Sequence, residues 1–162
     1  MPEDALPLPE QVYRCFLQDD PEAEAKHQET ANVRLVQQLY AAILRGDYHT
    51  VVEHLGEDIE WQILGPAELP FCGTVRGKRD AASALRRNFS GYQHIGAEVR
   101  DVVAQGRQVV VMCRETVRLE PLEEQLVLEW VQVFTIVGGQ VVKFREFFDT
   151  LTMRGVVERI VG

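Results

Sequence analysis

Four strand-like stretches follow one another toward the end of the chain, and this succession constrains the fold more than any other feature. They cover residues 93–104, 107–119, 124–137 and 140–149, separated by Gln105-Gly106, Pro121 and Gly138-Gly139. Short turns between consecutive strands are typical of antiparallel sheets. Because helical patterns precede these strands and do not alternate with them, the sequence predicts an α+β fold.

Most of the helical patterns lie in the first half of the chain. Asp20-Pro21 predicts the start of a helix that extends to Arg45, with a break near Thr30 left open. Gly46 ends this helix and Asp47 caps a shorter one. The remaining elements are a strand over 59–63, a loop over 65–77 with a hairpin near 71–75, a helix over 78–89, and a segment 151–160 that fits either a helix or an extended strand.

The chain is predicted to form one domain preceded by an arm. Residues 1–19 are first Pro-rich and acidic and then contain a short apolar cluster, which predicts a flexible N-terminal arm. Residues 20–162 are predicted to form a single domain, since a chain of 162 residues is long enough to bury one core.

Charge and cysteine content exclude several classes of protein. The net charge of −8 argues against nucleic acid or an anionic membrane as a partner. No apolar run approaches the ~20 residues that span a bilayer. The first ten residues hold three acidic residues and no basic one, unlike a signal peptide. Cys15, Cys72 and Cys113 are odd in number and follow no ligand spacing, so we expect a reducing, cytoplasmic location.

The stretch 124–137 is apolar on both of its faces. Leu126, Leu128, Trp130, Phe134 and Ile136 share one face, and Val127, Val131, Val133 and Val137 share the other. An antiparallel sheet with one wet face is not expected to be apolar on both. The first face can cover the helices, and no helix remains for the second. We therefore expect a homodimer that packs through the sheet.

Glu146 is the best candidate for chemistry in the sequence. It lies between Phe144 and Phe148 on one strand face, where a lone charge is costly unless it is paired or used. One interpretation is a general acid or base whose proton affinity is raised by the apolar setting. The other is a structural ion pair with Arg114 from a neighbouring strand, which would lower the proton affinity. The sequence leaves both open.

From Asn32 to about Met153 the chain resembles the SnoaL-like and ketosteroid-isomerase-like branch of the nuclear-transport-factor-2-like (NTF2-like) superfamily. The resemblance rests on residues 33–40, Arg45-Gly46-Asp47, residues 58–61, residues 71–77 and residues 141–149. It implies a cone-shaped, curved antiparallel sheet wrapped around N-terminal helices, an apolar cavity and a dimer. It carries less information about function, because this fold serves isomerases, cyclases, hydrolases and non-catalytic binders.

Within this superfamily, the segment Arg145 to Asp149 is similar to the end of limonene epoxide hydrolase. That resemblance implies that Glu146 takes the place of the base and Arg114 that of its arginine, with Thr116 at a second acidic position. Trp61 and Ile63 then replace the tyrosine and asparagine that hold the water. Because isoleucine has no polar group and tryptophan can only donate, the resemblance disfavours epoxide hydrolysis.

The site expected from these arguments has two catalytic and seven ligand-binding residues. The catalytic residues are Glu146 and Arg114, and the ligand-binding residues are Trp61, Phe71, Thr116, Leu128, Trp130, Phe144 and Phe148. No metal site is expected, since the histidines lack ligand spacing, and no cofactor motif is present.

Three functions remain at this point. The leading hypothesis is a protein that binds a small hydrophobic, oxygen-bearing molecule and catalyses proton transfer of the isomerase or cyclase type without a cofactor. The alternative is a non-catalytic ligand-binding or dimerisation module, and epoxide hydrolysis is a weaker third. The sequence does not decide whether the chain is an enzyme.

Overall fold

A computed structural model describes residues 21–69, 71–89, 93–119 and 124–161 of the chain. The predicted arm 1–19 lies outside the described residues. Within the described part, four helices accompany a single six-stranded sheet: α2 (Pro21–Leu44), α3 (Tyr48–Glu53), α4 (Lys78–Phe89) and α5 (Thr150–Val161). The predicted α+β class is confirmed.

The first two helices follow the predicted signals. α2 continues through Thr30, whose hydroxyl donates to the carbonyl of Lys26 at 2.9 Å, so the helix has no break there. Gly46 follows it with a φ of 70°, a left-handed conformation that glycine adopts without strain. Asp47 then caps α3 by accepting from the backbone N–H of Thr50 at 3.1 Å.

The final segment, which the sequence left undecided, is the helix α5. Asp149 accepts from the backbone N–H groups of Leu151 and Thr152, both at 3.1 Å, and from the Thr152 hydroxyl at 2.7 Å. These hydrogen bonds satisfy donors at the start of the helix, and they lower the pKa of Asp149. Asp149 is therefore a cap, as its position before the helix suggests.

The six strands form one curved sheet in the order β2-β1-β6-β5-β4-β3. Their bounds are β1 (Leu55–Leu64), β2 (Gly73–Arg76), β3 (Gln93–Gln105), β4 (Gln108–Leu119), β5 (Glu124–Val137) and β6 (Gln140–Phe148). The predicted meander of four strands is confirmed. The pairing of β1 with β6 is parallel, whereas the other four pairings of the sheet are antiparallel. The predicted hairpin near 71–75 is instead the short strand β2, which pairs with β1.

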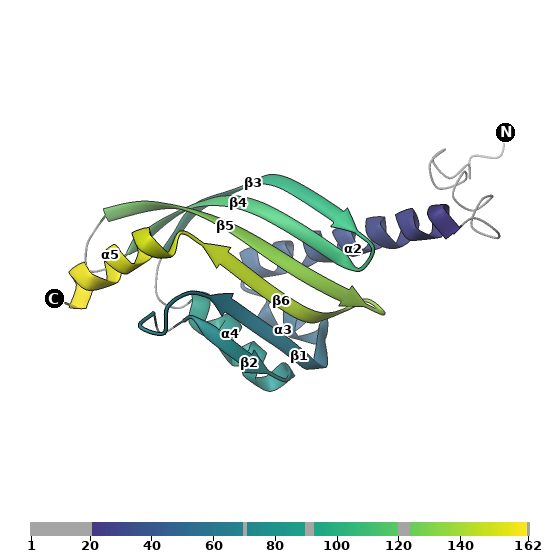
Figure 1. The fold of residues 1–162 in the computed structure, drawn as a ribbon, viewed down its shortest axis with the longest axis horizontal. Helices are drawn as coiled ribbons and strands as arrows, with labels where there is room; N and C mark the ends of the chain where they lie inside the picture. Colours follow the sequence, from purple (N-terminus) through teal and green to yellow (C-terminus); the bar gives the residue numbers. More distant parts are fainter. Residues whose placement is uncertain (1–20, 70, 90–92, 120–123, 162) are drawn as a thin grey trace.

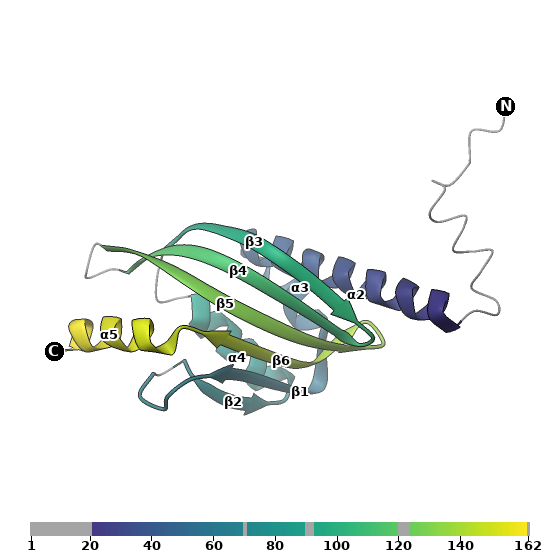
Figure 2. The same ribbon diagram turned by 45° about the horizontal axis from the view of Figure 1, so that its top comes forward.

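Helices α2, α3 and α4 lie against one face of the sheet, and α5 extends beyond the end of β6 (Figures 1 and 2). We call the helix-covered face the inner face. Its side chains alternate along each strand with those of the outer face. On β4, for example, Val109, Val111 and Cys113 are buried on the inner face.

The outer face of β3 to β5 remains partly apolar. Val127 is 47% exposed near one end of β5, and Val137 at its other end and Val103 on β3 are comparably exposed on the same face. Val131 and Val133 lie between them and are half-buried. The predicted two-sided apolar pattern of β5 is thus confirmed. Among the described helices, none is long and apolar enough to cross a membrane.

Candidate functional site

Glu146 lies on the inner face of β6, between Phe144 and Phe148, as the alternation predicts. Its register partners are Ile63 on β1 and Gln132 on β5. Since partners in register point to the same side of a sheet, these three side chains form one row across the inner face. A carboxylate is thereby held among apolar and amide groups.

Among the described residues, the Glu146 carboxylate contacts an amide and no cation. The side-chain N–H of Gln132 donates to Glu146 Oε2 at 2.5 Å. The carbonyl oxygen of the same amide accepts a hydrogen bond from the Tyr40 hydroxyl, which reaches down from α2. The Tyr40–Gln132–Glu146 chain fixes the orientation of the carboxylate while adding no positive charge to it.

This environment raises the pKa of Glu146 to about 7. Desolvation by the surrounding apolar side chains is the largest cause, and the negative charge of Glu115 adds to it, while the hydrogen bond from Gln132 acts in the opposite direction. Burial also raises the pKa of Tyr40 well above its ordinary value. Near neutral pH, Glu146 therefore exists in both its protonated and its ionised form.

Arg114 and Thr116 do not lie beside Glu146. Arg114 is exposed on the outer face of β4, in register with Glu129 of β5 and Glu98 of β3. Thr116 follows on the same outer face. Of the two interpretations left open for Glu146, the ion pair with Arg114 is therefore wrong, because the inner face of β4 is formed by the alternate residues.

The inner face of β4 brings a second carboxylate, Glu115, into the site. Glu115 is only 8% exposed and accepts from the indole N–H of Trp130 at 3.2 Å. The imidazole Nδ1 of His94, from β3, contacts the same carboxylate. Trp130 also stacks on the ring of Tyr40, with centroids 6.2 Å apart. One indole thus joins the Glu115–His94 pair to the Tyr40–Gln132–Glu146 chain.

The predicted aromatic residues gather on this inner face. Trp61 stacks on Phe144 with centroids 3.9 Å apart, and Phe71 lies 5.7 Å from Phe148. Leu128 is buried opposite Glu115. The structure therefore brings together all the predicted ligand-binding residues except Thr116.

Trp61 has one unusual feature. Its side chain is buried, at 6% exposed, and its indole N–H has no hydrogen-bond partner among the described residues. A buried donor without a partner is costly, by about 1–3 kcal/mol. An acceptor atom of a bound molecule would remove that cost.

Burial decreases along the inner face toward the end of β6. Phe134 and Phe144 are buried beneath the helices, whereas Trp130, Glu146 and Phe148 are half-buried. Phe71, which faces Phe148, is half-buried as well. Glu146 therefore lies among half-buried aromatic side chains, whereas Glu115 farther along the inner face is buried.

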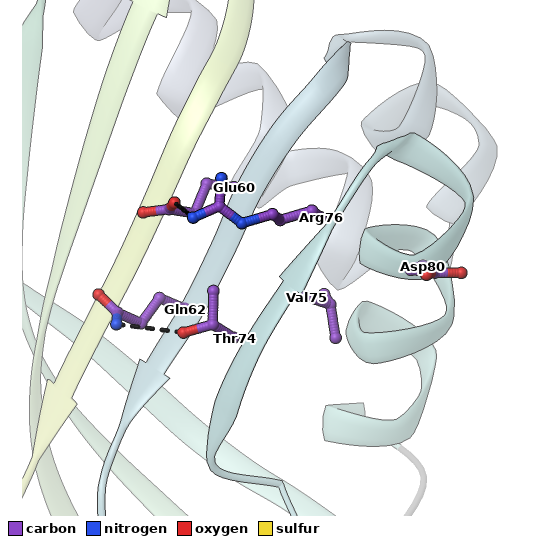
Figure 3. Close-up of a pocket in the computed structure, with 6 residues that line it drawn as sticks. All are labelled: Glu60, Gln62, Thr74, Val75, Arg76 and Asp80. Carbon is purple, nitrogen blue, oxygen red and sulfur yellow. Dashed lines mark hydrogen bonds and ion pairs between the residues drawn. The ribbon is translucent and has the colours of Figure 1, made fainter.

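A hollow of about 610 Å³ lies elsewhere, at the β1–β2 edge of the sheet. Its lining is mostly polar, with Glu60, Gln62, Thr74, Val75, Arg76 and Asp80 (Figure 3). Arg76 contacts Glu60 at 2.7 Å, and the Gln62 amide donates to the Thr74 hydroxyl at 3.1 Å, so these groups already satisfy one another. None of the predicted ligand-binding residues lines this hollow, and the apolar cavity at Glu146 stays a prediction.

The described residues contain no group of three His, Cys, Asp or Glu side chains placed to hold a metal ion. Cys72 and Cys113 are free thiols, and burial raises the pKa of each to about 11. A thiol with a raised pKa is a poor nucleophile at neutral pH. The site's chemistry is therefore that of its carboxylates, its imidazole and its phenol.

Sequence reasoning missed four polar residues of this site: Tyr40, His94, Glu115 and Gln132. Three of them carried a usable signal. Glu115 and Gln132 each interrupt an otherwise apolar strand face, as Glu146 does, and Tyr40 recurs at helical spacing with the apolar residues Val36 and Ile43 of α2. His94 carried none, because its contact depends on the pairing of β3 with β4.

Comparison with known proteins identifies the family. Residues 36–144 match the model of the SnoaL-like domain. An NTF2-like protein from Burkholderia xenovorans is 31% identical, with a TM-score of 0.70 over 78% of this chain and 95% of that one.

Two further solved structures share the fold at lower identity. A putative SnoaL-like polyketide cyclase from Jannaschia is 24% identical (TM-score 0.68, 78% of this chain and 90% of that one). An epoxide hydrolase of M. tuberculosis, similar to limonene epoxide hydrolase, is 23% identical (TM-score 0.62, 83% and 98%). No curated protein matches the chain.

The matched segment covers most of the described domain, from the middle of α2 to the Phe144 position of β6. It includes Tyr40, Gln132 and the strands that carry Glu115 and Trp130. The chain therefore belongs to the SnoaL-like family of the NTF2-like superfamily.

Proposed function

We propose that this protein binds a small hydrophobic molecule bearing a carbonyl oxygen on the inner face and moves a proton on it through Glu146. The observation that carries this proposal is a carboxylate, Glu146, that Gln132 holds on the inner face between Phe144 and Phe148, where burial raises its pKa to about 7. General acid–base catalysis is most effective when the pKa of the group lies near the working pH. The reaction class is isomerisation or cyclisation without a cofactor.

The surroundings of Glu146 support a ligand of this kind. The half-buried rings of Phe148, Phe71 and Trp130 offer apolar contact area beside the carboxylate. The buried indole N–H of Trp61 has no hydrogen-bond partner among the described residues, and a ligand oxygen that came to lie beside it would accept from it. A few polar groups within an apolar lining are typical of small-molecule sites.

The test is proton exchange on a simple enolisable ketone. We expect the wild-type protein to accelerate deuterium uptake by β-tetralone in D₂O, measured by NMR, above the rate in buffer alone. Glu146→Gln, which keeps an acceptor for Gln132, should lose this acceleration by about 100-fold or more. Glu68→Gln, a change of the same kind at an exposed loop residue, is the matched control. Equal rates for wild type and Glu146→Gln would refute the proposal.

A non-catalytic binding module is the second candidate, and one observation favours it. The rings of Trp61 and Phe144 stack closely and are both buried, so they fill part of the inner face themselves. In that case tryptophan fluorescence would report ligand binding with similar affinity in wild type and Glu146→Gln, and neither protein would exchange protons.

We also propose a homodimer through the outer face. Val127, Val131 and Val133 lie on this face, which no described helix covers, and the exposed pair of Glu129 and its register partner Arg114 lies between Val127 and Val131. A second copy presents the same three valines and the same two charges, so a two-fold arrangement is self-complementary. The free thiols of Cys72 and Cys113 support a location in the reducing cytoplasm.

A further inference from the structure

A glutamine amide lies between a phenol and the Glu146 carboxylate. Gln132 and Glu146 are register partners on the inner face, and the amide N–H of Gln132 donates to Glu146 Oε2 at 2.5 Å. The amide oxygen, Oε1, accepts from the Tyr40 hydroxyl, which belongs to α2. The amide therefore has one partner at its donor end and another at its acceptor end.

The two orientations of this amide suit different protonation states of Glu146. An ionised carboxylate only accepts hydrogen bonds, so the amide must turn its N–H toward it and its oxygen toward Tyr40. In the opposite orientation the amide oxygen would face Glu146, and it could accept a hydrogen bond only from the protonated acid. The Tyr40 hydroxyl would then lose its acceptor in Gln132. A donor at Tyr40 thus favours the orientation that suits the carboxylate.

Tyr40 is a permanent donor at neutral pH. Burial is the largest cause that raises the pKa of its phenol well above the ordinary value, so the hydroxyl keeps its proton. The ring stacks on Trp130 at an interplanar angle of 17° and meets Phe134 edge-on, with centroids 6.2 Å apart in both pairs. Tyr40→Phe therefore removes the hydroxyl and keeps this packing.

The hydrogen bond from Gln132 opposes the other effects on Glu146. Burial is the largest cause of the raised pKa of Glu146, and the charge of Glu115 on β4 adds to it, whereas the Gln132 hydrogen bond lowers it. On β1 the register partner is the uncharged Ile63. The thiol of Cys72, between β1 and β2, senses the charge of Glu146 but stays neutral, because burial raises its pKa to about 11. Any group that fixes the amide therefore controls the proton affinity of Glu146.

We infer that Tyr40 is a positioning residue of this site: by donating to Oε1 of Gln132 it keeps the amide N–H on Glu146, and so keeps Glu146 in the form that removes a proton. The inference rests on the proposed function, in which Glu146 moves a proton on a ligand, and it names the residue that prepares Glu146 for this step. Tyr40 acts through Gln132 and transfers no proton itself.

Tyr40→Phe tests the inference through the titration of Glu146. Without the hydroxyl the amide can turn its oxygen to the protonated acid, so we expect the titration midpoint of Glu146 to rise by about one pH unit. The ¹³C shift of its side-chain carboxyl, assigned by its absence in Glu146→Gln, measures this midpoint by NMR without any ligand. Gln132→Leu removes the amide altogether and should raise the midpoint at least as much.

A double variant separates positioning from a direct effect of the hydroxyl. If Tyr40 acts through the amide, Tyr40→Phe should move the Glu146 midpoint by less than about 0.2 pH unit once Gln132 has been replaced by leucine. An equal shift in both backgrounds would show that the hydroxyl acts on Glu146 directly, and it would overturn the inference.

Gln62 and Thr74 provide a matched control on the opposite face of the sheet. The Gln62 amide N–H donates to the Thr74 hydroxyl at 3.1 Å (Figure 3). Its oxygen accepts from Nε of Arg145 at 3.1 Å, so this amide also has a partner at each end. Gln62→Leu and Thr74→Val should both leave the Glu146 midpoint at its wild-type value. Shifts as large as that of Tyr40→Phe would count against positioning by Tyr40.

Deuterium uptake by β-tetralone gives a second readout. At pH 7 the ionised fraction of Glu146 should fall from about one half in the wild type to about one tenth in Tyr40→Phe. The rate should fall about fivefold with it and return to the wild-type rate at about pH 9, where Glu146 is ionised in both proteins. A loss that persists at this pH would contradict the inference, because it would not reflect protonation.

The results distinguish this inference from the proposed function. A raised midpoint in Tyr40→Phe, together with a rate that recovers at high pH, supports the inference. A wild-type midpoint near pH 7 that Tyr40→Phe leaves unchanged overturns the inference, while the proposed function stands. No exchange above buffer by the wild-type protein overturns the proposed function and, with it, the role of Tyr40 in catalysis.

Discussion

The raised pKa of Glu146 has a direct consequence for stability. In the folded chain the pKa is about 7, compared with the ordinary value of 4.5 that applies when the chain is unfolded. As the pH rises between these values, the unfolded state releases its proton while the folded state keeps it. The free energy of unfolding must therefore fall over this range, since it decreases with pH wherever the folded state binds more protons.

The size of this effect follows from the two values. One pKa unit corresponds to about 1.4 kcal/mol, so a rise from 4.5 to about 7 corresponds to about 3 kcal/mol. This is an upper value, because Glu146 is half-buried and water screens part of its charge. The contribution is complete below the unfolded pKa and is lost as the pH passes through the folded one.

Glu146→Gln isolates this contribution, because glutamine resembles the protonated acid in shape and cannot ionise. At about pH 4 we expect the variant and the wild type to have nearly equal free energies of unfolding. At about pH 8 the variant should be more stable, by up to about 3 kcal/mol. Urea unfolding followed by tryptophan fluorescence measures both values.

Glu68→Gln serves as the control for removing one negative charge from this acidic protein. Glu68 is exposed in the loop after β1. Its stability curve should run parallel to that of wild type over the whole pH range. If the Glu146→Gln curve also runs parallel to wild type, the reasoning that desolvation raises the pKa of Glu146 is refuted.

Three further predictions follow from particular contacts. Tyr40→Phe removes the hydroxyl that donates to Gln132 and should lower the free energy of unfolding in urea by about 1 kcal/mol. An unchanged free energy of unfolding would argue against the Tyr40 contact. Asp149→Ala removes the cap of α5 and should lower the free energy of unfolding by about 1 kcal/mol. Amide hydrogen exchange should become faster in α5 and nowhere else. Unchanged exchange in α5 would contradict this role of Asp149. Val131→Glu places a charge in the proposed interface on the outer face and should give a monomer when its mass is measured by light scattering. The control Glu68→Gln should stay dimeric. A wild-type protein that is itself a monomer would exclude the proposed dimer.

Local patterns in the sequence predict most of the fold. The helix caps at Asp47 and Asp149 and the glycine turn at residues 138–139 depend on neighbours in the chain, and these features are observed. The parallel pairing of β1 with β6 is different. It joins residues about 80 positions apart in the sequence, as Trp61 and Phe144 show. Only the packing of the whole sheet determines it.

In the candidate site too, some residues can be placed from their neighbours in the chain, and others only from the packing of the sheet. The alternation of β6 places Glu146 with its two phenylalanines, because adjacent residues of a strand point to opposite faces. On β4, alternation defines two sets of residues but does not state which is inner. Arg114 belongs to one set, and Glu115 to the other together with Cys113 and Val117. The apolar members of the second set identify it as the inner face, and they are the signal that would have found Glu115.

The protonation state of Glu146 can also be measured without any ligand or variant. Uniform ¹³C labelling of glutamate allows the side-chain carboxyl shift of Glu146 to be followed by NMR as the pH is raised, with assignment by its absence in Glu146→Gln. We expect a titration midpoint near pH 7, where the proton can be both given and taken. A midpoint near the ordinary glutamate value of about 4.3 would show a carboxylate that stays charged, and it would contradict the proposed role in proton transfer.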